Sequence, residues 1–77
     1  MLESSEFNGK IAAFLKIPRE KVANEAVLTD LVRDSFALVD LVVELQEDYG
    51  ARLTQEDLKD VRTVGELFAQ FAGKLKS

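Results

Sequence analysis

Apolar residues recur at helical spacing along most of this chain, and no stretch alternates apolar and polar residues for long enough to predict a strand. The first helical segment places four apolar side chains on one face: Phe7, Ile11, Phe14 and Leu15. Ser4 or Ser5 is expected to cap the start of this helix, and Pro18 prevents its continuation. The spacing therefore predicts an all-α protein.

A second long helix is predicted from about Ser35 to Tyr49. Its expected buried stripe consists of Leu38, Val42, Leu45 and Tyr49, with Val39 and Leu41 on the flanks. Gly50 follows directly and suits the left-handed conformation in which many helices end. A short third helix should have Thr54 as its cap, with Leu58 and Val61 pointing inward.

The last helix is expected to open at Thr63-Val64-Gly65-Glu66, which matches the capping box S/T-x-x-E. Its apolar residues continue at helical spacing as Val64, Leu67, Phe68, Phe71 and Leu75.

Between the first two helices, Pro18 to Val22 predicts a short turn, and Ala26, Val27 and Leu28 are expected to anchor the loop to the core. The result is a small four-helix bundle with a long first loop and a short third helix. Because 77 residues cannot divide their apolar content between two cores, residues 1–77 are expected to form one domain.

The chain contains no cysteine and no histidine. This composition removes disulfides, imidazole bases and the usual zinc ligands, so no metal site is expected.

The net charge of −4 disfavours nucleic acid and anionic membranes as partners and suits a protein that binds basic surfaces. No apolar run approaches the roughly 20 residues of a membrane span, and the N-terminus lacks the pattern of a signal peptide. A cytoplasmic location is therefore expected.

Asp34-Ser35-Phe36 stands where the long loop meets the predicted second helix. One interpretation is a helix cap, because Asp and Ser are both preferred at helix starts. The other is that the Ser35 hydroxyl accepts a phosphoryl group, which the free N–H groups and the dipole of a helix N-terminus favour. The pattern alone leaves both open. An enzymatic role for Ser35 is not expected, because the chain has no histidine to activate it and no lysine at a suitable local spacing.

The second helix is strongly acidic, with five acids and no Lys or Arg between Asp34 and Ala51. A row of apolar and acidic side chains lies beside its core stripe at Phe36, Asp40, Val43 and Glu47. Such a row is typical of a docking face for a basic partner, although a solvated face gives the same charge pattern.

Seven aliphatic residues could surround a space between the second, third and fourth helices: Leu28, Leu45, Leu53, Leu58, Val61, Val64 and Leu67. In an arbitrary helical domain such a set is simply core. Aliphatic side chains that change rotamer would also suit a bundle that opens to admit an apolar acyl chain. The sequence leaves both possibilities open.

The stretch Leu31-Val32-Arg33-Asp34-Ser35-Phe36, followed by Val39 to Glu47, resembles the motif of acyl carrier proteins, usually Leu-Gly-x-Asp-Ser-Leu ahead of an acidic helix. The resemblance covers nearly the whole chain. It implies that a phosphopantetheinyl transferase attaches 4′-phosphopantetheine to Ser35, with Asp34 as the flanking motif residue. It also implies partner contacts at Phe36, Asp40, Val43, Glu44 and Glu47, made with acyl-transferring, ketosynthase or adenylating enzymes that present basic surfaces.

Three residues depart from the usual motif: Val32 replaces the glycine, Arg33 precedes the Asp-Ser pair, and Phe36 replaces the commoner leucine. Asp34-Ser35-Phe36, followed by Val39-Asp40-Leu41 and Glu44-Leu45-Gln46-Glu47, is similar to D-alanyl and aminoacyl carriers as much as to fatty-acid carriers. The expected function is a discrete, monomeric, non-enzymatic carrier of a polyketide or mixed polyketide/peptide pathway. A D-alanyl or fatty-acid carrier is the alternative, and an unmodified helical docking module is the alternative of another class.

Overall fold

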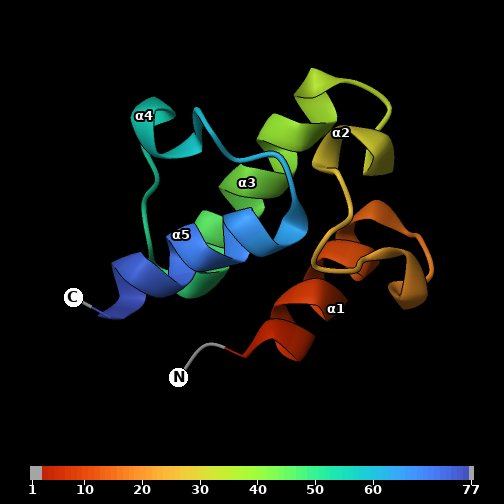
Figure 1. The fold of residues 1–77 in the computed structure, drawn as a ribbon, viewed down its shortest axis with the longest axis horizontal. Coiled ribbons are helices and arrows are strands. Elements are labelled where there is room, and N and C mark those ends of the chain that lie inside the picture. The colour runs from red at the N-terminus through yellow and green to blue at the C-terminus, as the bar shows by residue number, and fades with distance from the viewer. Residues whose placement is uncertain (1–2, 77) are drawn as a thin grey trace.

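The computed structural model describes residues 3–76, and every regular element in this range is helical (Figure 1). The elements in chain order are α1 (Ser4–Leu15), the 3-10 turn η1 (Arg19–Lys21), α2 (Leu28–Leu31), α3 (Ser35–Tyr49), α4 (Gln55–Leu58) and α5 (Val64–Lys76). The prediction of a small all-α bundle with a long first connection and a short helix before the last one is confirmed. The sequence does not predict α2, because four residues are too few to show a helical period. No helix within residues 3–76 has the length and apolar character needed to cross a membrane.

A cluster of apolar side chains joins the three longer helices, α1, α3 and α5. Its largest fully buried members are Phe7, Ile11, Leu41, Leu45, Val64, Leu67 and Phe71. The Phe7 ring of α1 lies with its centroid 6.0 Å from that of Tyr49 on α3 and 5.6 Å from that of Phe71 on α5. One aromatic side chain therefore contacts both of the other long helices, and its burial links all three.

Four side chains are placed differently from the prediction. Leu41, expected on a flank of the buried stripe of α3, is fully buried, whereas Val39 is 58% exposed. The apolar residues of α3 cover more than half of its circumference, so their spacing alone does not decide which of them face the core. Phe14 and Leu75 are also partly exposed, and both lie in the last turn of their helix, at the edge of the core.

The structure also corrects the predicted start of α1. Its N-cap residue is Glu3, which makes no side-chain cap hydrogen bond, and Ser4 and Ser5 lie inside the first turn. The predicted serine cap is wrong because the helix begins before either hydroxyl can occupy the cap position. The end of α3 is as predicted, with Gly50 in the left-handed region at φ 65°.

The long first connection is fixed to the segment that leads into α5 by backbone pairing. The contacts are Leu28 N–H to Arg62 O at 2.8 Å, Val64 N–H to Ala26 O at 3.0 Å, and an antiparallel bridge between Val27 and Thr63. Each of these hydrogen bonds pairs a backbone N–H or C=O group that has no hydrogen-bond partner within a helix. The loop that leads to Ser35 is therefore held by the start of the last helix.

The three residues expected to anchor this loop do so in different ways. Leu28 is buried and Ala26 packs against the core from a partly buried position. Val27 is 39% exposed, so the prediction that its side chain anchors the loop is wrong. Its backbone bridge to Thr63 turns the side chain toward the surface and holds the segment by main-chain contact instead.

The hydrogen bonds of the predicted capping box at the start of α5 are present. Glu66 N–H donates to Thr63 Oγ1 at 3.2 Å, and Glu66 Oε1 accepts from Thr63 N–H at 2.9 Å and from Arg62 N–H at 2.8 Å. These bonds to backbone N–H groups, that of Arg62 first, lower the pKa of the Glu66 carboxyl below its ordinary value of 4.5. The fold therefore favours the charged carboxylate.

The lowered pKa of Glu66 predicts a loss of stability in acid. A carboxyl with a lowered folded pKa contributes its full stabilisation above the unfolded value of 4.5 and loses it as pH falls through the folded value. Glu66→Gln keeps an acceptor oxygen for the box but has no charge to lose. Its melting temperature should therefore fall less than that of the wild type between about pH 6 and about pH 3. The control is Glu20→Gln in η1, and an unchanged pH dependence in Glu66→Gln would contradict the prediction.

Candidate functional site

Ser35 is the first residue of α3 and its side chain is exposed. The preceding Asp34 caps the helix, because its extended backbone directs the carboxylate so that Oδ1 accepts a hydrogen bond from Ala37 N–H at 2.9 Å. The Ser35 hydroxyl makes no hydrogen bond within residues 3–76. Asp34 therefore supplies the cap of α3, and the Ser35 hydroxyl is not needed for it.

The surroundings of Ser35 fit a hydroxyl that receives an anionic group. α3 is 15 residues long, so the positive end of its dipole lies at this hydroxyl. Arg33 is exposed two residues earlier in the same loop. Because the chain has no histidine or cysteine, Ser35 has no such base of its own to activate it. The site is thus suited to modification by a separate enzyme.

α3 presents the predicted docking residues to solvent. Phe36 is 79% exposed and Val43 is 46% exposed. The three acids implied by the resemblance are also exposed: Asp40, Glu44 and Glu47. None of these three forms an ion pair within the described part of the chain, and they therefore remain available to a partner.

Two further residues define the limits of this surface. Asp48, one turn after Glu44, lies at the edge of this surface toward α1, and its carboxylate lies 3.6 Å from Lys10 Nζ on that helix. Val39 belongs to the exposed surface, since it is exposed between Phe36 and Val43 at helical spacing. The i, i+3, i+7 spacing of these three residues is the sequence signal that could have identified Val39. We call Phe36, Val39, Asp40, Val43, Glu44 and Glu47 the α3 row.

An apolar cavity of about 300 Å³ lies between α3, α4 and α5, and we call it the central cavity. Five of the seven aliphatic residues predicted around such a space line it: Leu28, Leu53, Leu58, Val61 and Leu67. Leu45 and Val64 do not line it, because both are buried in the core beneath it. Its remaining walls, which the sequence did not indicate, are Leu38, Val39, Val42, Val43, Gln46 and Gln55.

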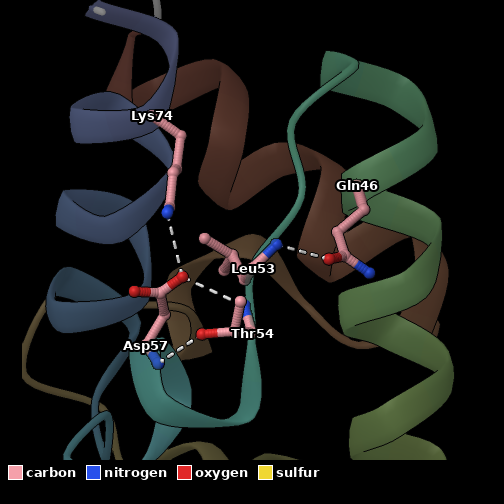
Figure 2. A network of polar contacts seen from close by, with 5 residues as sticks. All are labelled: Gln46, Leu53, Thr54, Asp57 and Lys74. Atoms are coloured by element: carbon pink, nitrogen blue, oxygen red, sulfur yellow. Dashed lines mark hydrogen bonds and ion pairs between the residues drawn. The ribbon is translucent and has the colours of Figure 1, made fainter.

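A polar network holds the α4 wall of the central cavity in place (Figure 2). Gln46 Oε1 on α3 accepts a hydrogen bond from Leu53 N–H at 2.6 Å. Thr54 and Asp57 form a capping box, in which Asp57 N–H donates to Thr54 Oγ1 at 3.1 Å and Thr54 N–H donates to Asp57 Oδ2 at 3.0 Å. Lys74 Nζ on α5 lies 3.1 Å from the same Asp57 oxygen. The short helix is therefore fastened to both long helices that flank it.

The charge on Asp57 is favoured by this network. The hydrogen bond from the Thr54 N–H, followed by that from the Lys74 ammonium, lowers the pKa of the Asp57 carboxyl below its ordinary value of 3.8. Thr54 as a helix cap was predicted, but the links through Gln46 and Lys74 were not, because they join residues far apart in the sequence.

A family model described as the phosphopantetheine attachment site matches residues 7–71, a stretch that contains Ser35, the α3 row and the central cavity. The chain belongs to the acyl carrier protein family. The cofactor of this family is covalently attached phosphopantetheine, and its members are non-catalytic carriers that work with phosphopantetheinyl transferases and synthase enzymes.

Named acyl carrier proteins are similar to this carrier. That of Saccharopolyspora erythraea is 43% identical over 56 residues, which cover 71% of this chain and 59% of that protein. That of Thermotoga maritima is 32% identical over 72 residues, 92% of this chain and 89% of that protein. The meromycolate extension acyl carrier protein of Mycolicibacterium aurum is 35% identical over 52 residues, 68% of this chain and 54% of that protein. The match thus spans between half and two thirds of the length of the first and third of these relatives.

The division of roles between Asp34 and Ser35 can be tested by unfolding the carrier in urea. Asp34→Ala removes the cap of α3 and should lower the free energy of unfolding by about 1 kcal/mol. Ser35→Ala keeps the cap and places a good helix former at the first helical position, so its effect should stay below about 0.5 kcal/mol. Equal losses in the two variants would mean that Ser35 shares the capping role.

Proposed function

We propose that this carrier holds acyl intermediates as thioesters on a phosphopantetheine arm at Ser35 and shuttles them between biosynthetic enzymes. The observation that carries the proposal is the exposed hydroxyl of Ser35, which is free of hydrogen bonds within residues 3–76 because Asp34 supplies the cap of α3. The family match to residues 7–71 supports the same assignment.

Attachment of the arm would form a bond between Ser35 Oγ and a phosphorus of coenzyme A. The bond that breaks joins this phosphorus to the oxygen of the adenosine bisphosphate part, which leaves. The proton of the Ser35 hydroxyl passes to a base of the transferase, since this chain contains no histidine to accept it. The arm ends in a thiol, so a chain without cysteine can carry a thioester.

The α3 row is the surface that we propose for partner enzymes. Its exposed acids attract a basic surface, while Phe36 and Val43 supply apolar contact beside the attachment site. The partners would be a phosphopantetheinyl transferase and acyl-transferring, ketosynthase or adenylating enzymes. Binding through exposed charges is weak and salt-sensitive, which allows the carrier to leave each enzyme after reaction.

The central cavity is the space that we propose for the apolar part of the cargo. Its walls are aliphatic except for Gln46 and Gln55. An acyl chain tethered at Ser35 reaches it past Leu38, which lies one turn further along α3 and lines the cavity. Burial there would remove apolar surface of the chain from water.

For the pathway, we propose a cytoplasmic, monomeric carrier of polyketide or mixed polyketide/peptide synthesis, with residues 1–77 as one carrier domain. The departures at Val32, Arg33 and Phe36 support a specialised pathway. A fatty-acid carrier is the second candidate, and it is favoured by the similarity to a relative whose name assigns it to meromycolate extension.

The attachment site is tested by incubating the protein with coenzyme A and a broad-specificity phosphopantetheinyl transferase. Intact mass should increase by one phosphopantetheine, and Ser35→Ala should abolish the increase while the variant stays folded. The neighbouring hydroxyl variant Thr29→Val serves as the control and should be modified like the wild type. A wild-type protein that stays unmodified with several transferases would leave only the unmodified docking module.

The docking surface is tested through its charges. Asp40→Lys and Glu47→Lys should each slow transfer of the arm by a basic partner at low salt, and the deficit should shrink as salt screens the interaction. Glu25→Lys, an exposed acid of the first connection, changes the net charge equally and is the control. If Glu25→Lys slows transfer as much as the α3 variants, net charge and not the α3 row is responsible.

A further inference from the structure

A second cavity opens beside the first turns of α3. Its volume is about 350 Å³, and it is lined by Val27, Leu28, Thr29, Leu38, Val61 and Arg62. We call it the Arg62 cavity. It shares Leu28, Leu38 and Val61 with the central cavity, so the two spaces meet at common walls. The polar groups differ: the central cavity has two amides, whereas this one has a hydroxyl and a guanidinium.

The backbone of Arg62 is held firmly at this wall. Its carbonyl oxygen accepts the hydrogen bond from Leu28 N–H at 2.8 Å, and its own N–H donates to Glu66 Oε1 at 2.8 Å. The position from which the side chain extends is therefore fixed from both sides. An arginine so placed needs to order only its side chain in order to bind a ligand.

The guanidinium itself has no partner in the structure. It forms no ion pair and no side-chain hydrogen bond within residues 3–76. The carboxylate of Glu66, four residues later in the chain, directs Oε1 at the N–H groups of Arg62 and Thr63 and at the Thr63 hydroxyl. A permanent positive charge thus stands at the rim of a mainly apolar cavity, where Glu66 is an electrostatic neighbour but forms no ion pair with it.

The attachment site places a tethered group close to this cavity. Leu38 lies three residues after Ser35, on the same side of α3, and lines both cavities. A group on an arm at Ser35 meets Leu38 on its way to either space. Because the group is tethered, its effective concentration near both cavities is high. Even a weak difference in affinity between the cavities therefore decides which one it occupies.

We propose that the Arg62 cavity binds acyl cargo that ends in a carboxylate, with Arg62 as the recognising residue. This proposal rests on the proposed attachment of the arm at Ser35. A guanidinium pairs with a carboxylate through two parallel hydrogen bonds, and the aliphatic walls can contact the apolar part of the same cargo. Wholly apolar cargo enters the central cavity instead, so the two cavities separate cargo by the charge of its far end.

The test loads the carrier directly from malonyl-coenzyme A, isovaleryl-coenzyme A or unacylated coenzyme A with a phosphopantetheinyl transferase. Malonyl and isovaleryl groups have nearly the same shape, but only malonyl carries a carboxylate. Intact mass confirms the loading, and ¹⁵N–¹H spectra then report on the amides of Leu28, Thr29 and Arg62 and on the Arg62 side-chain Nε–H.

Malonyl loading should shift the Arg62 Nε–H and the amides of the Arg62 cavity. Isovaleryl loading should shift residues that line only the central cavity, such as Leu53 and Leu58. Arg62→Gln should remove more than half of the malonyl-specific shift change. Lys59→Gln removes the same charge from an exposed residue that lines neither cavity, and it should leave the shift changes as in the wild type.

Four results would overturn the proposal. If malonyl and isovaleryl give the same shifts, or if Arg62→Gln keeps the malonyl pattern, Arg62 does not recognise the carboxylate. If the unacylated arm alone shifts Arg62 as much as malonyl does, the anion bound is the phosphodiester and not the cargo. If no mass is gained, the arm at Ser35 is itself wrong, and the proposal falls with it.

Discussion

The hydrogen bond from Ala37 N–H to the Asp34 carboxylate is the interaction on which the functional site depends. Every helix begins with N–H groups that lack partners within the helix, and a nearby side chain usually provides for one of them. In α3 this partner comes from the residue before the helix, so the first residue within it, Ser35, keeps its hydroxyl for other chemistry. The same geometry leaves the remaining N–H groups and the positive end of the dipole beside that hydroxyl, where a phosphodiester would lie.

The walls of both cavities are positioned by hydrogen bonds as well as by packing against the core. A helix of four residues such as α4 is not stable on its own, because its few hydrogen bonds do not offset the cost of ordering the chain. The links from Gln46 to Leu53 and from Lys74 to Asp57 fasten it to α3 and α5. On the other side, the pairing of Leu28 with Arg62 fixes the loop that leads to Ser35. These links hold the walls around the two cavities.

The distribution of charge along α3 follows from the same packing. Asp48 lies on the side of the helix that meets α1, where Lys10 is close to it. Asp40, Glu44 and Glu47 are exposed on the same surface as Phe36 and Val43, and no cation of the described residues forms an ion pair with them. Exposed carboxylates are solvated by water and need no cation from the same chain. Their charge speeds the association with a basic partner.

The sequence by itself determined α1, α3, α4, α5 and the Asp34-Ser35-Phe36 motif, because these depend on residues that are close together in the chain. Helical spacing predicted α3 from Ser35 to Tyr49 and the exposed row from Phe36 to Glu47. Local residue types predicted Gly50 as the end of α3 and the capping-box hydrogen bonds of Thr63 and Glu66. The apolar residues of α3 cover more than half of its circumference, so only the tertiary structure decided which of them are buried, and it placed Leu41 inside and Val39 outside. It also separated Leu45 and Val64 from the cavity walls and brought Arg62 beside Leu28. Contacts of this kind join segments distant in sequence, and no local pattern of residues records them.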